Sequence, residues 1–444
     1  MAKITKTKNE IKSPEKKSEK KEALNSEQVL IKKVLAYEIL NSSGRPTLEV
    51  KIIGTNDESA SASYPFDNYE TLFSDKDKID GNNERYGGWG RLSSLELIKE
   101  KVAPAILNKN ILNQEEIDSI LSELNAEKRD KLGPAIVYCV SLANALLGAK
   151  ILKKEFFEYV IDTYRFKKAS KKNLPIAIFN IFNGGDTGDT DLDFQEFLLI
   201  PKKESVAENI RKSSEVFLEL AEVLKESGYD TDTGQEGGYA PEMDSSIEAL
   251  EFILSAIIRR NYNPGEDFNL GIDIGSSILY DEDEKKYVFS LDRNYFSSLD
   301  LISLYEEWLS RFPITYLEDA FSENDWESWQ KVNNRLGKTI SLAGDDLLSS
   351  NIKRLRESLN KGALNTVVLK PAKAGSLTES VLYAKLAQDR GYRLVVSGLN
   401  QETNDSFLAD LAVAFEADYF KAGSLSRGER TIKYNRLLEI ENLL

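Results

Sequence analysis

Residues 366–398 read TVVLKPAKAGSLTESVLYAKLAQDRGYRLVVSG, and the fold class can be inferred from their pattern. The run TVVLKP predicts a strand, because apolar and β-branched residues follow one another without a break. SLTESVLYAKLAQDRG has apolar residues at three- and four-residue spacing, which predicts a helix. YRLVVSG then predicts the next strand. A strand, a helix and a second strand in this order are the repeating unit of an α/β fold.

The same alternation extends over most of the chain, beginning near Leu174. The other strand candidates are PIAIFNIF, DFQEFLLI, FNLGIDIG, ITYLEDAF, TISLAGDDL and DYFKAGS. Helical patterns such as LISLYEEWLSRF and SFLADLAVAFEA follow most of the strands. Eight strands with mostly helical connections predict a (β/α)8-type barrel. Residues 204–262 predict two helices in a row, so the alternation is irregular there.

The N-terminal part of the chain has a different pattern. Residues 31–55 predict two strands joined by the turn Ser-Ser-Gly-Arg-Pro, and residues 95–165 predict helices. Residues 57–94 have clusters of Gly, Asp, Asn and Ser and predict a long loop region. We therefore expect an α+β capping domain over residues 31–170, a barrel domain over 171–444 and a separate tail over 1–30.

The chain has no histidine among its 444 residues, and this limits its chemistry. The absence excludes Ser-His-Asp and Cys-His catalysis, histidine metal sites and histidine acid-base chemistry. The single cysteine, Cys139, excludes an internal disulfide and predicts a reducing, cytoplasmic setting. Since no apolar run approaches the ~18 residues that span a bilayer, we expect no transmembrane segment.

The net charge of −15 is unevenly distributed. Residues 1–30 hold eight lysines and five glutamates and carry +3, so the rest carries −18. This acidic body is not expected to bind nucleic acid. The lysine-rich tail lacks large apolar residues and is predicted to be disordered. Two hypotheses for the tail stay open: a solvated segment without a partner, and an electrostatic tether to RNA or an anionic membrane.

Charged residues stand at the ends of the predicted barrel strands. The strand ends carry Asp273, Glu318, Asp345, Lys370 and Lys421. In such barrels these ends surround one mouth, so the side chains should converge. Three carboxylates would form a hard oxygen site that suits Mg2+. The alternative is that these acids only form structural salt bridges with the two lysines.

Two further acids and the lysines suggest acid-base chemistry. Glu196 lies on an earlier strand candidate, and Glu236 lies in the following loops within GQEGGYAP. A lysine beside a cation and a second lysine should have a lowered pKa, which would bring it towards the range of a general base.

From about Ala36 to the C-terminus the chain resembles the enolase family. The matching stretches are AYEILNSSGRPTLEV, DKLGPAIVYCVSLA, NIFNGG, QEFLLIP, EGGYAP, YLEDAFSENDWESW, GDDL, GSLTES and KAGSLSRGERTIKYNRLLEIE, in the family's order and spacing. The resemblance implies an enolase-like (β/α)8-type barrel with an N-terminal α+β capping domain. It also implies a Mg2+-dependent lyase, phosphopyruvate hydratase, which converts 2-phosphoglycerate to phosphoenolpyruvate and water in glycolysis.

The resemblance also implies a role for each matching residue. Asp273, Glu318 and Asp345 match the ligands of the family's first Mg2+. Lys370 matches the base that takes the proton from C2. Glu236 matches the acid that assists loss of the C3 hydroxyl, supported by Glu196, and Lys421 matches the lysine that holds the substrate carboxylate.

The chain departs from the family where the substrate phosphate binds. The family's Ser-His-Arg-Ser-Gly-Glu-Thr appears as residues 397–403, SGLNQET, which lack the histidine, the phosphate-binding arginine and its serine. Thr187 stands for the flap histidine and Gln235 for an aspartate. The mobile Ser-Gly-Ala-Ser-Thr-Gly loop is replaced by residues 63–67, SYPFD. Lys373 could supply a substitute cation, but its position three residues past Lys370 predicts that it faces solvent.

These departures leave two classes of function open. The chain could be an enzyme, either a hydratase with reduced activity or a lyase for another small carboxylate. It could also be a non-catalytic, enolase-like pseudoenzyme kept for binding or scaffolding. The family is usually dimeric, so the resemblance implies a homodimer, but the family's Ala-Arg-Glu segment reads Ala36-Tyr37-Glu38 here and one interface arginine is lost.

Overall fold

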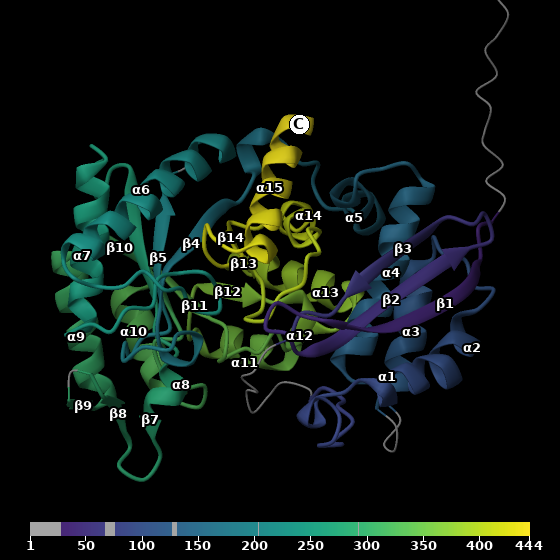
Figure 1. Cartoon of the computed structure of the whole chain (residues 1–444), viewed down its shortest axis with the longest axis horizontal. Coiled ribbons are helices and arrows are strands. Elements are labelled where there is room, and N and C mark those ends of the chain that lie inside the picture. Colours follow the sequence, from purple (N-terminus) through teal and green to yellow (C-terminus); the bar gives the residue numbers. More distant parts are fainter. Residues whose placement is uncertain (1–27, 67–75, 127–130, 203, 292) are drawn as a thin grey trace, which may run out of the picture.

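The structure, a computed structural model, describes residues 28–66, 76–126, 131–202, 204–291 and 293–444. Figure 1 shows a barrel surrounded by helices, with a smaller sheet-and-helix domain beside it. The predicted disordered tail lies outside the described residues except for 28–30. Asp67 also lies outside them.

The small domain begins with an antiparallel sheet of strands β1 (Ile31–Leu40), β2 (Pro46–Gly54) and β3 (Ser59–Ser63). Its first turn forms because Asn41 Oδ1 accepts hydrogen bonds from the backbone of Ser43 and Arg45, at 3.0 Å each. Gly44 between them has φ +72°, a conformation that favours glycine. The predicted hairpin is confirmed.

Strand β3 lies inside the stretch that was predicted to be loop. Its sequence SASAS has no large apolar residue and so gives no strand signal. Pairing with β2 forms it, and Ala62 is completely buried. The prediction of a continuous loop over residues 57–94 was therefore wrong at this end. It was also wrong at the other end, where the helical residues η1 (Tyr86–Gly88) and α1 begin.

Helix α4 (Pro134–Ile151) packs against β2 and β3 of this sheet. The other helical elements of the small domain are α1 (Leu92–Leu97), the π-helical turn η2 (Ile98–Val102), α2 (Ala103–Ile106), α3 (Gln114–Asn125) and α5 (Phe156–Tyr164). Helix α4 is long and apolar enough to cross a membrane by length and composition, with a mean hydropathy of 1.5 over 18 residues. However, 78% of it is buried inside the protein, as expected of a core helix.

The barrel contains all eight predicted strands. In their order around the barrel they are β4 (Ile176–Asn183), β5 (Glu196–Pro201), β6 (Phe268–Asp273), β10 (Ile314–Glu318), β11 (Ser341–Gly344), β12 (Thr366–Leu369), β13 (Arg393–Ser397) and β14 (Tyr419–Lys421). Strand β14 pairs with β4 and closes the barrel. The outer helices are α6 (Val206–Glu226), α7 (Ser246–Arg259), α9 (Ser298–Arg311), α10 (Trp326–Leu336), α11 (Ile352–Lys361), α13 (Leu377–Asp389), α14 (Leu408–Ala414) and α15 (Gly428–Leu443).

One strand runs against the others. Strand β5 pairs antiparallel with both β4 and β6. The link from β4 holds only the short turn η4 (Gly185–Thr187), whereas a parallel neighbour needs a long crossover. The two consecutive helices α6 and α7 then return the chain to β6, as the irregular pattern of residues 204–262 predicts. Because β5 is reversed, its first residue, Glu196, lies opposite Asp273 at the mouth.

The remaining elements are short. The turns are η3 (Lys171–Asn173), α8 (Ser276–Leu279) and α12 (Pro371–Ala374). A small antiparallel sheet of β7 (Tyr280–Asp281), β8 (Lys286–Phe289) and β9 (Asn294–Phe296) extends from the barrel (Figure 1). The sequence analysis did not predict this sheet.

Backbone pairing joins the small domain to the barrel. Phe66 and Gln401 exchange two backbone hydrogen bonds, of 2.8 and 2.9 Å. The Ser63 N–H also donates to Asp405 Oδ2 at 2.7 Å. The segment that follows β3 is therefore tied to the loop that follows β13.

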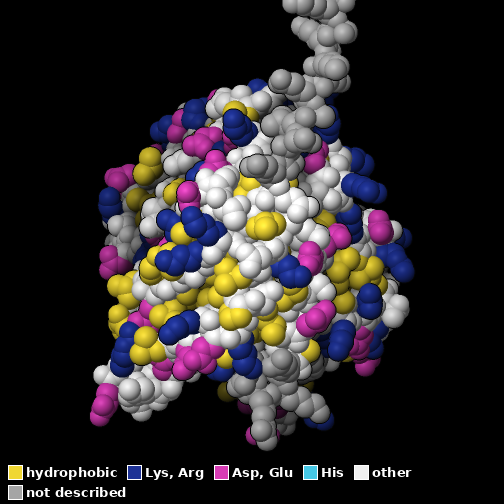
Figure 2. Space-filling view, turned by 90° about the vertical axis from the view of Figure 1, so that its right-hand side faces the viewer, with side chains coloured by type: hydrophobic (Ala, Val, Ile, Leu, Met, Phe, Trp, Pro, Cys, Tyr) yellow, Lys and Arg dark blue, Asp and Glu magenta, His cyan; other side chains and the backbone are white. Residues whose placement is uncertain are grey.

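The outer face of the small domain mixes side-chain types. Figure 2 shows hydrophobic groups interspersed with basic and acidic ones on this side of the molecule. On β1, Tyr37 and Leu40 are 43% and 58% exposed. A homodimer remains a prediction.

Candidate functional site

The barrel mouth gathers an excess of buried acids. Seven carboxylates and two lysines there are each at most 8% exposed: Glu196, Glu236, Asp273, Glu318, Asp319, Asp345, Asp346, Lys370 and Lys421. The strand register brings them together, since Glu196 and Glu318 both lie opposite Asp273. All seven predicted site residues are in this group. Ionised buried acids need compensating charge, so the excess favours either protonation or a bound cation.

Lys421 lies at the centre of three carboxylates. Its Nζ donates to Glu196 Oε2 at 3.0 Å, Asp273 Oδ2 at 3.0 Å and Glu318 Oε1 at 2.7 Å. Burial alone would lower the pKa of Lys421, but the surrounding carboxylates raise it well above its usual value. The salt bridges of the alternative interpretation therefore do form.

Lys370 makes the second ion pair. Its Nζ lies 2.5 Å from Asp345 Oδ2, and its backbone N–H donates to Ser350 Oγ at 2.9 Å. Burial would raise the pKa of Asp345, but the charges of Lys370 and Lys373 hold it below the usual value. Lys373 is only partly exposed, and its charge acts on the site.

Several other carboxylates at the mouth lack enough nearby positive charge to stay ionised. Burial, reinforced by the charge of Asp273, raises the pKa of Glu318 to about 8. Burial and the charge of Asp345 raise the pKa of Asp346 to about 7. Burial also raises the pKa of Glu196 well above its usual value, although Lys421 opposes this shift. The two lysines therefore do not neutralise the mouth.

Two groups of three carboxylates are close enough to hold a metal ion. One is Asp273, Glu318 and Asp319, and the other is Asp319, Asp345 and Asp346; in each, one oxygen from every residue lies within 4.8 Å of the others. The predicted set of Asp273, Glu318 and Asp345 is thus divided between the two groups, with Asp319 common to both. The sequence analysis missed Asp319 and Asp346, although each directly follows a predicted ligand.

The donor set fits a hard divalent cation. Asp273 Oδ1 and Asp345 Oδ1 are buried and have no hydrogen-bond partner within the described part of the chain. Each could therefore face a cation without breaking a bond. Carboxylate oxygens are the ligands that Mg2+ prefers, so the residues present fit this ion.

Asp319 also organises the mouth from within. Its Oδ1 accepts the Asp345 N–H at 3.1 Å and its Oδ2 accepts the Asp346 N–H at 2.9 Å. Asp319 itself has φ +44°, which is uncommon for a residue with a side chain. It therefore sets the start of the loop after β11.

A cavity of about 380 Å³, including space open to solvent, brings these groups together. Its lining contains Thr187, Gln195, Glu196, Glu236, Asp273, Asp345, Asp346, Lys370, Ser397, Gly398, Asn400 and Lys421. The lysines and acids predicted for proton transfer thus share one cavity. Thr187 Oγ1 lies within 2.9 Å of the Gly184 and Gln195 carbonyl oxygens, so contacts within the flap hold it.

Leu399 is buried within the loop that follows β13. Its side chain is 1% exposed and belongs to the hydrophobic core. The guanidinium of Arg430 donates to the carbonyl oxygens of Leu399, at 2.8 Å, and Asn400, at 2.5 Å. This arginine therefore holds the loop backbone, and both of its terminal nitrogens already have partners there.

We expect the Glu318→Gln variant to lose Mg2+ binding. The substitution replaces a central carboxylate, which both Lys421 and a cation would use, with a neutral amide. Calorimetric titration with Mg2+ would measure the loss, with Glu327→Gln on exposed α10 as the matched control. Unchanged binding in Glu318→Gln would contradict the metal site.

Tyr316 is expected to position Glu318. The buried Tyr316 hydroxyl donates a short hydrogen bond to Glu318 Oε2, on the opposite side of the carboxylate from Lys421. Removing such a partner of a ligand typically weakens metal binding by about 10–100-fold. We therefore expect Tyr316→Phe to weaken Mg2+ binding by about this factor in the same titration.

A neighbouring tyrosine offers the control. Tyr419 packs edge-on against Tyr316 with ring centroids 5.9 Å apart, and its hydroxyl lies near Ser341 rather than near an acid. Tyr419→Phe should therefore leave Mg2+ affinity within about twofold. Equal losses in both variants would mean that barrel packing, and not the bond to Glu318, causes the effect.

Comparison with known protein families covers both domains. Residues 31–160 match the model of the enolase N-terminal domain, and residues 171–444 match the model of the enolase C-terminal TIM barrel domain. The closed barrel, the N-terminal sheet domain and the acids at the mouth agree with these matches. The chain belongs to the enolase family.

Proposed function

We propose that the protein is a Mg2+-dependent lyase that removes the C2 proton of a 3-hydroxycarboxylate and releases the C3 hydroxyl as water. The observation that carries this proposal is the shared cavity, which has Lys370 and Glu236 in its lining beside carboxylates suited to a cation. An enolase-like lyase agrees with the family, whereas the substrate and the level of activity are part of the proposal.

Each residue has a role that its position supports. Lys370 Nζ accepts the C2 proton, and it lies beside Asp345 Oδ2 at 2.5 Å. Glu236 donates a proton to the departing hydroxyl, and Glu196 lies in the same cavity. Lys421 holds the substrate carboxylate. When bound by the acids, Mg2+ would stabilise the negative charge that develops on that carboxylate.

We propose that 2-phosphoglycerate is a poor substrate. The residues that bind its phosphate in the family are replaced, and Leu399 is buried in apolar surroundings. Removing one partner of a buried charge pair typically costs ~2–5 kcal/mol. This corresponds to roughly 30-fold to several-thousand-fold in binding, at ~1.4 kcal/mol per decade.

Proton exchange tests the proposal without requiring complete turnover. The protein would be incubated in D2O with Mg2+ and a series of 3-hydroxycarboxylates that includes 2-phosphoglycerate, and loss of the C2 proton signal followed by NMR. We expect exchange that stops when Mg2+ is chelated. If no compound exchanges while calorimetry still shows Mg2+ binding, the protein is a non-catalytic member of the family.

A further inference from the structure

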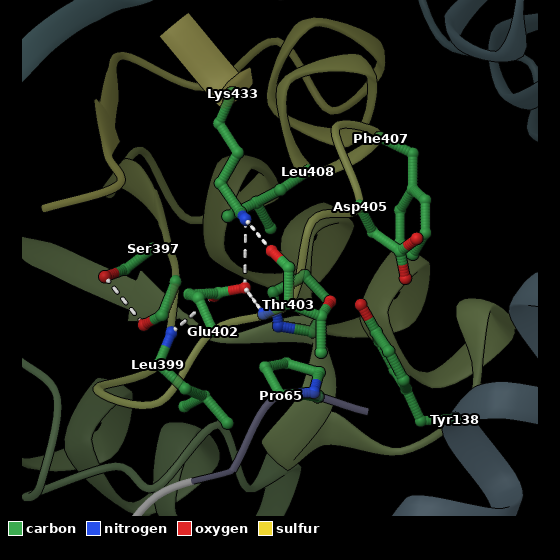
Figure 3. Close-up of a pocket in the computed structure, with 13 residues that line it drawn as sticks. Pro65, Tyr138, Ser397, Leu399, Glu402, Thr403, Asp405, Phe407, Leu408 and Lys433 are labelled. Atoms are coloured by element: carbon green, nitrogen blue, oxygen red, sulfur yellow. Dashed lines mark hydrogen bonds and ion pairs between the residues drawn. The ribbon is translucent and has the colours of Figure 1, made fainter. Parts of the chain in front are cut away.

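A second, small cavity, about 300 Å³ when space open to solvent is included, adjoins the cavity of acids and lysines (Figure 3). The two share Ser397 and Gly398 in their linings, at the end of β13. Pro371 and Ala372, which directly follow Lys370, also line the second cavity. A group attached to the carbon that gives its proton to Lys370 would therefore extend into this space.

Much of the wall of this second cavity is apolar. Leu399, Phe407 and Leu408 are each at most 6% exposed, and Pro65 and Tyr138 add further carbon surface. Figure 3 shows these side chains around the space, with Leu408 beside Lys433 and with Pro65 and Leu399 on the other side. Such a lining favours an uncharged group.

The charged groups of the cavity already have partners. Lys433, the only basic residue among the described residues of the lining, has three ammonium hydrogens and three acceptors. These are Glu402 Oε2 at 3.0 Å, the Thr403 carbonyl at 3.0 Å and the Glu429 carbonyl at 2.8 Å. The other two charged residues of the lining, Glu402 and Asp405, are acids.

Asp405, the second acid of the lining, would repel an anion that entered the cavity. Asp405 Oδ2 accepts the Ser63 N–H at 2.7 Å, and burial raises the pKa of Asp405 to about 6, so it is mostly ionised at neutral pH. A phosphate entering the cavity would lose its water, would find the Lys433 ammonium already bonded to three acceptors, and would meet a carboxylate.

The cavity also has fixed dimensions. The backbone pairing of Phe66 with Gln401 holds Pro65 against the loop after β13. On the other side, Leu399 N–H donates to Glu402 Oε1 at 2.9 Å, which fixes the loop carrying Leu399. A rigid apolar wall selects by size as well as by charge.

We propose that this cavity is a subsite for a small, uncharged alkyl group on C2 of the substrate, in place of a phosphate. The inference rests on the proposed lyase function and names its substrate class, 2-alkyl-3-hydroxycarboxylates. Lys370 takes the C2 proton, the C3–O bond breaks, and the hydroxyl leaves as water with a proton from Glu236. A C2=C3 double bond forms, and no oxidant or reductant is consumed.

Two compounds that differ only at C2 test the subsite. These are 3-hydroxy-2-methylpropanoate and 2-phosphoglycerate, whose dissociation constants would be measured by calorimetry in the presence of Mg2+. We expect the methyl compound to bind at least about tenfold more tightly, which is about 1.4 kcal/mol. Equal binding, or tighter binding of 2-phosphoglycerate, would overturn the proposal.

Variants at Leu399 test whether the preference for the methyl compound arises at this apolar wall. Leu399→Arg should shift the ratio of the two dissociation constants at least about tenfold towards 2-phosphoglycerate, whereas Leu399→Met should keep it. If Leu399→Arg does not fold, Leu399→Ala replaces it and should improve binding of the 2-ethyl homologue relative to the methyl compound. An unchanged ratio in the folded variant would refute the subsite.

The two proposals fail in different ways. The binding ratio does not depend on turnover, so it decides the subsite even where no proton exchanges. If no C2 proton exchanges but the methyl compound binds more tightly than 2-phosphoglycerate, the lyase is rejected and the subsite is kept. If C2 protons exchange but 2-phosphoglycerate binds more tightly, the subsite is rejected and the lyase is kept.

Discussion

Replacement of Lys370 by methionine should lower the rate of C2 proton exchange by about 10²–10⁴-fold, the usual contribution of a general base. Lys370 lies next to Asp345 in the lining of the cavity at the barrel mouth. Methionine keeps much of the length of lysine but cannot take a proton. The rate would be followed by NMR in D2O with a compound that the native protein exchanges. Mg2+ binding should persist, because the substitution removes a positive charge and no carboxylate.

Lys373 provides the matched control for this result. It lies three residues further on, and its charge also acts on Asp345, but it does not line the acid cavity among the described residues. Lys373→Met should therefore reduce exchange much less than Lys370→Met. If the exchange rate falls by a similar factor in both variants, the loss comes from removing a positive charge near the site, and Lys370 is not the base.

Replacement of Lys421 by methionine should destabilise the folded protein by about 3–5 kcal/mol at pH 8 without Mg2+. Three buried carboxylates, Glu196, Asp273 and Glu318, would lose their common cation. Urea unfolding monitored by circular dichroism would measure the change in the free energy of unfolding. An exposed pair gives the control, since Lys331→Met on α10 removes only a surface contact with Glu327.

The loss in Lys421→Met should depend on pH in a defined direction. The pKa of Glu318 is about 8 in the folded protein and lies near 4.5 when unfolded. A group with a raised folded-state pKa contributes stability that is present below the unfolded pKa and lost as pH rises through the folded value. Lys421 opposes the rise in this pKa, so its removal raises the pKa further and makes ionised Glu318 more costly. The loss of stability relative to the native protein should therefore shrink towards pH 5, and Mg2+ should restore stability at pH 8. An equal loss of stability at pH 5 and pH 8 would exclude unpaired carboxylate charge as the cause.

The sequence was sufficient for elements with a strong local signal. All eight barrel strands follow from their apolar runs, and the turn at Asn41 follows from Ser-Ser-Gly-Arg-Pro. Strand β3 was missed because its SASAS sequence gains stability only from β2 and α4. The reversal of β5 was also missed, because an apolar strand reads the same whichever way it runs.

The candidate site was predicted as a set of residues but not as a geometry. The rule that strand ends converge found Asp273, Glu318 and Asp345, yet it did not show that Lys421 already pairs with two of them. Asp319 and Asp346 could have been found as the second acids of Glu-Asp and Asp-Asp pairs. Side-chain direction after a strand end depends on backbone angles such as the positive φ of Asp319, which sequence pattern does not reveal.

The bond between Phe66 and Gln401 has a consequence for how the chain folds. These residues are 335 positions apart, from 66 to 401, and their pairing closes a very large loop. Loop closure of this kind carries an entropy cost and slows folding. During synthesis the small domain leaves the ribosome long before Gln401, so Phe66 cannot form this pairing until most of the barrel exists. Final docking of Phe66 against Gln401 should therefore be a late event, and the amides of these two residues should gain protection from hydrogen exchange together.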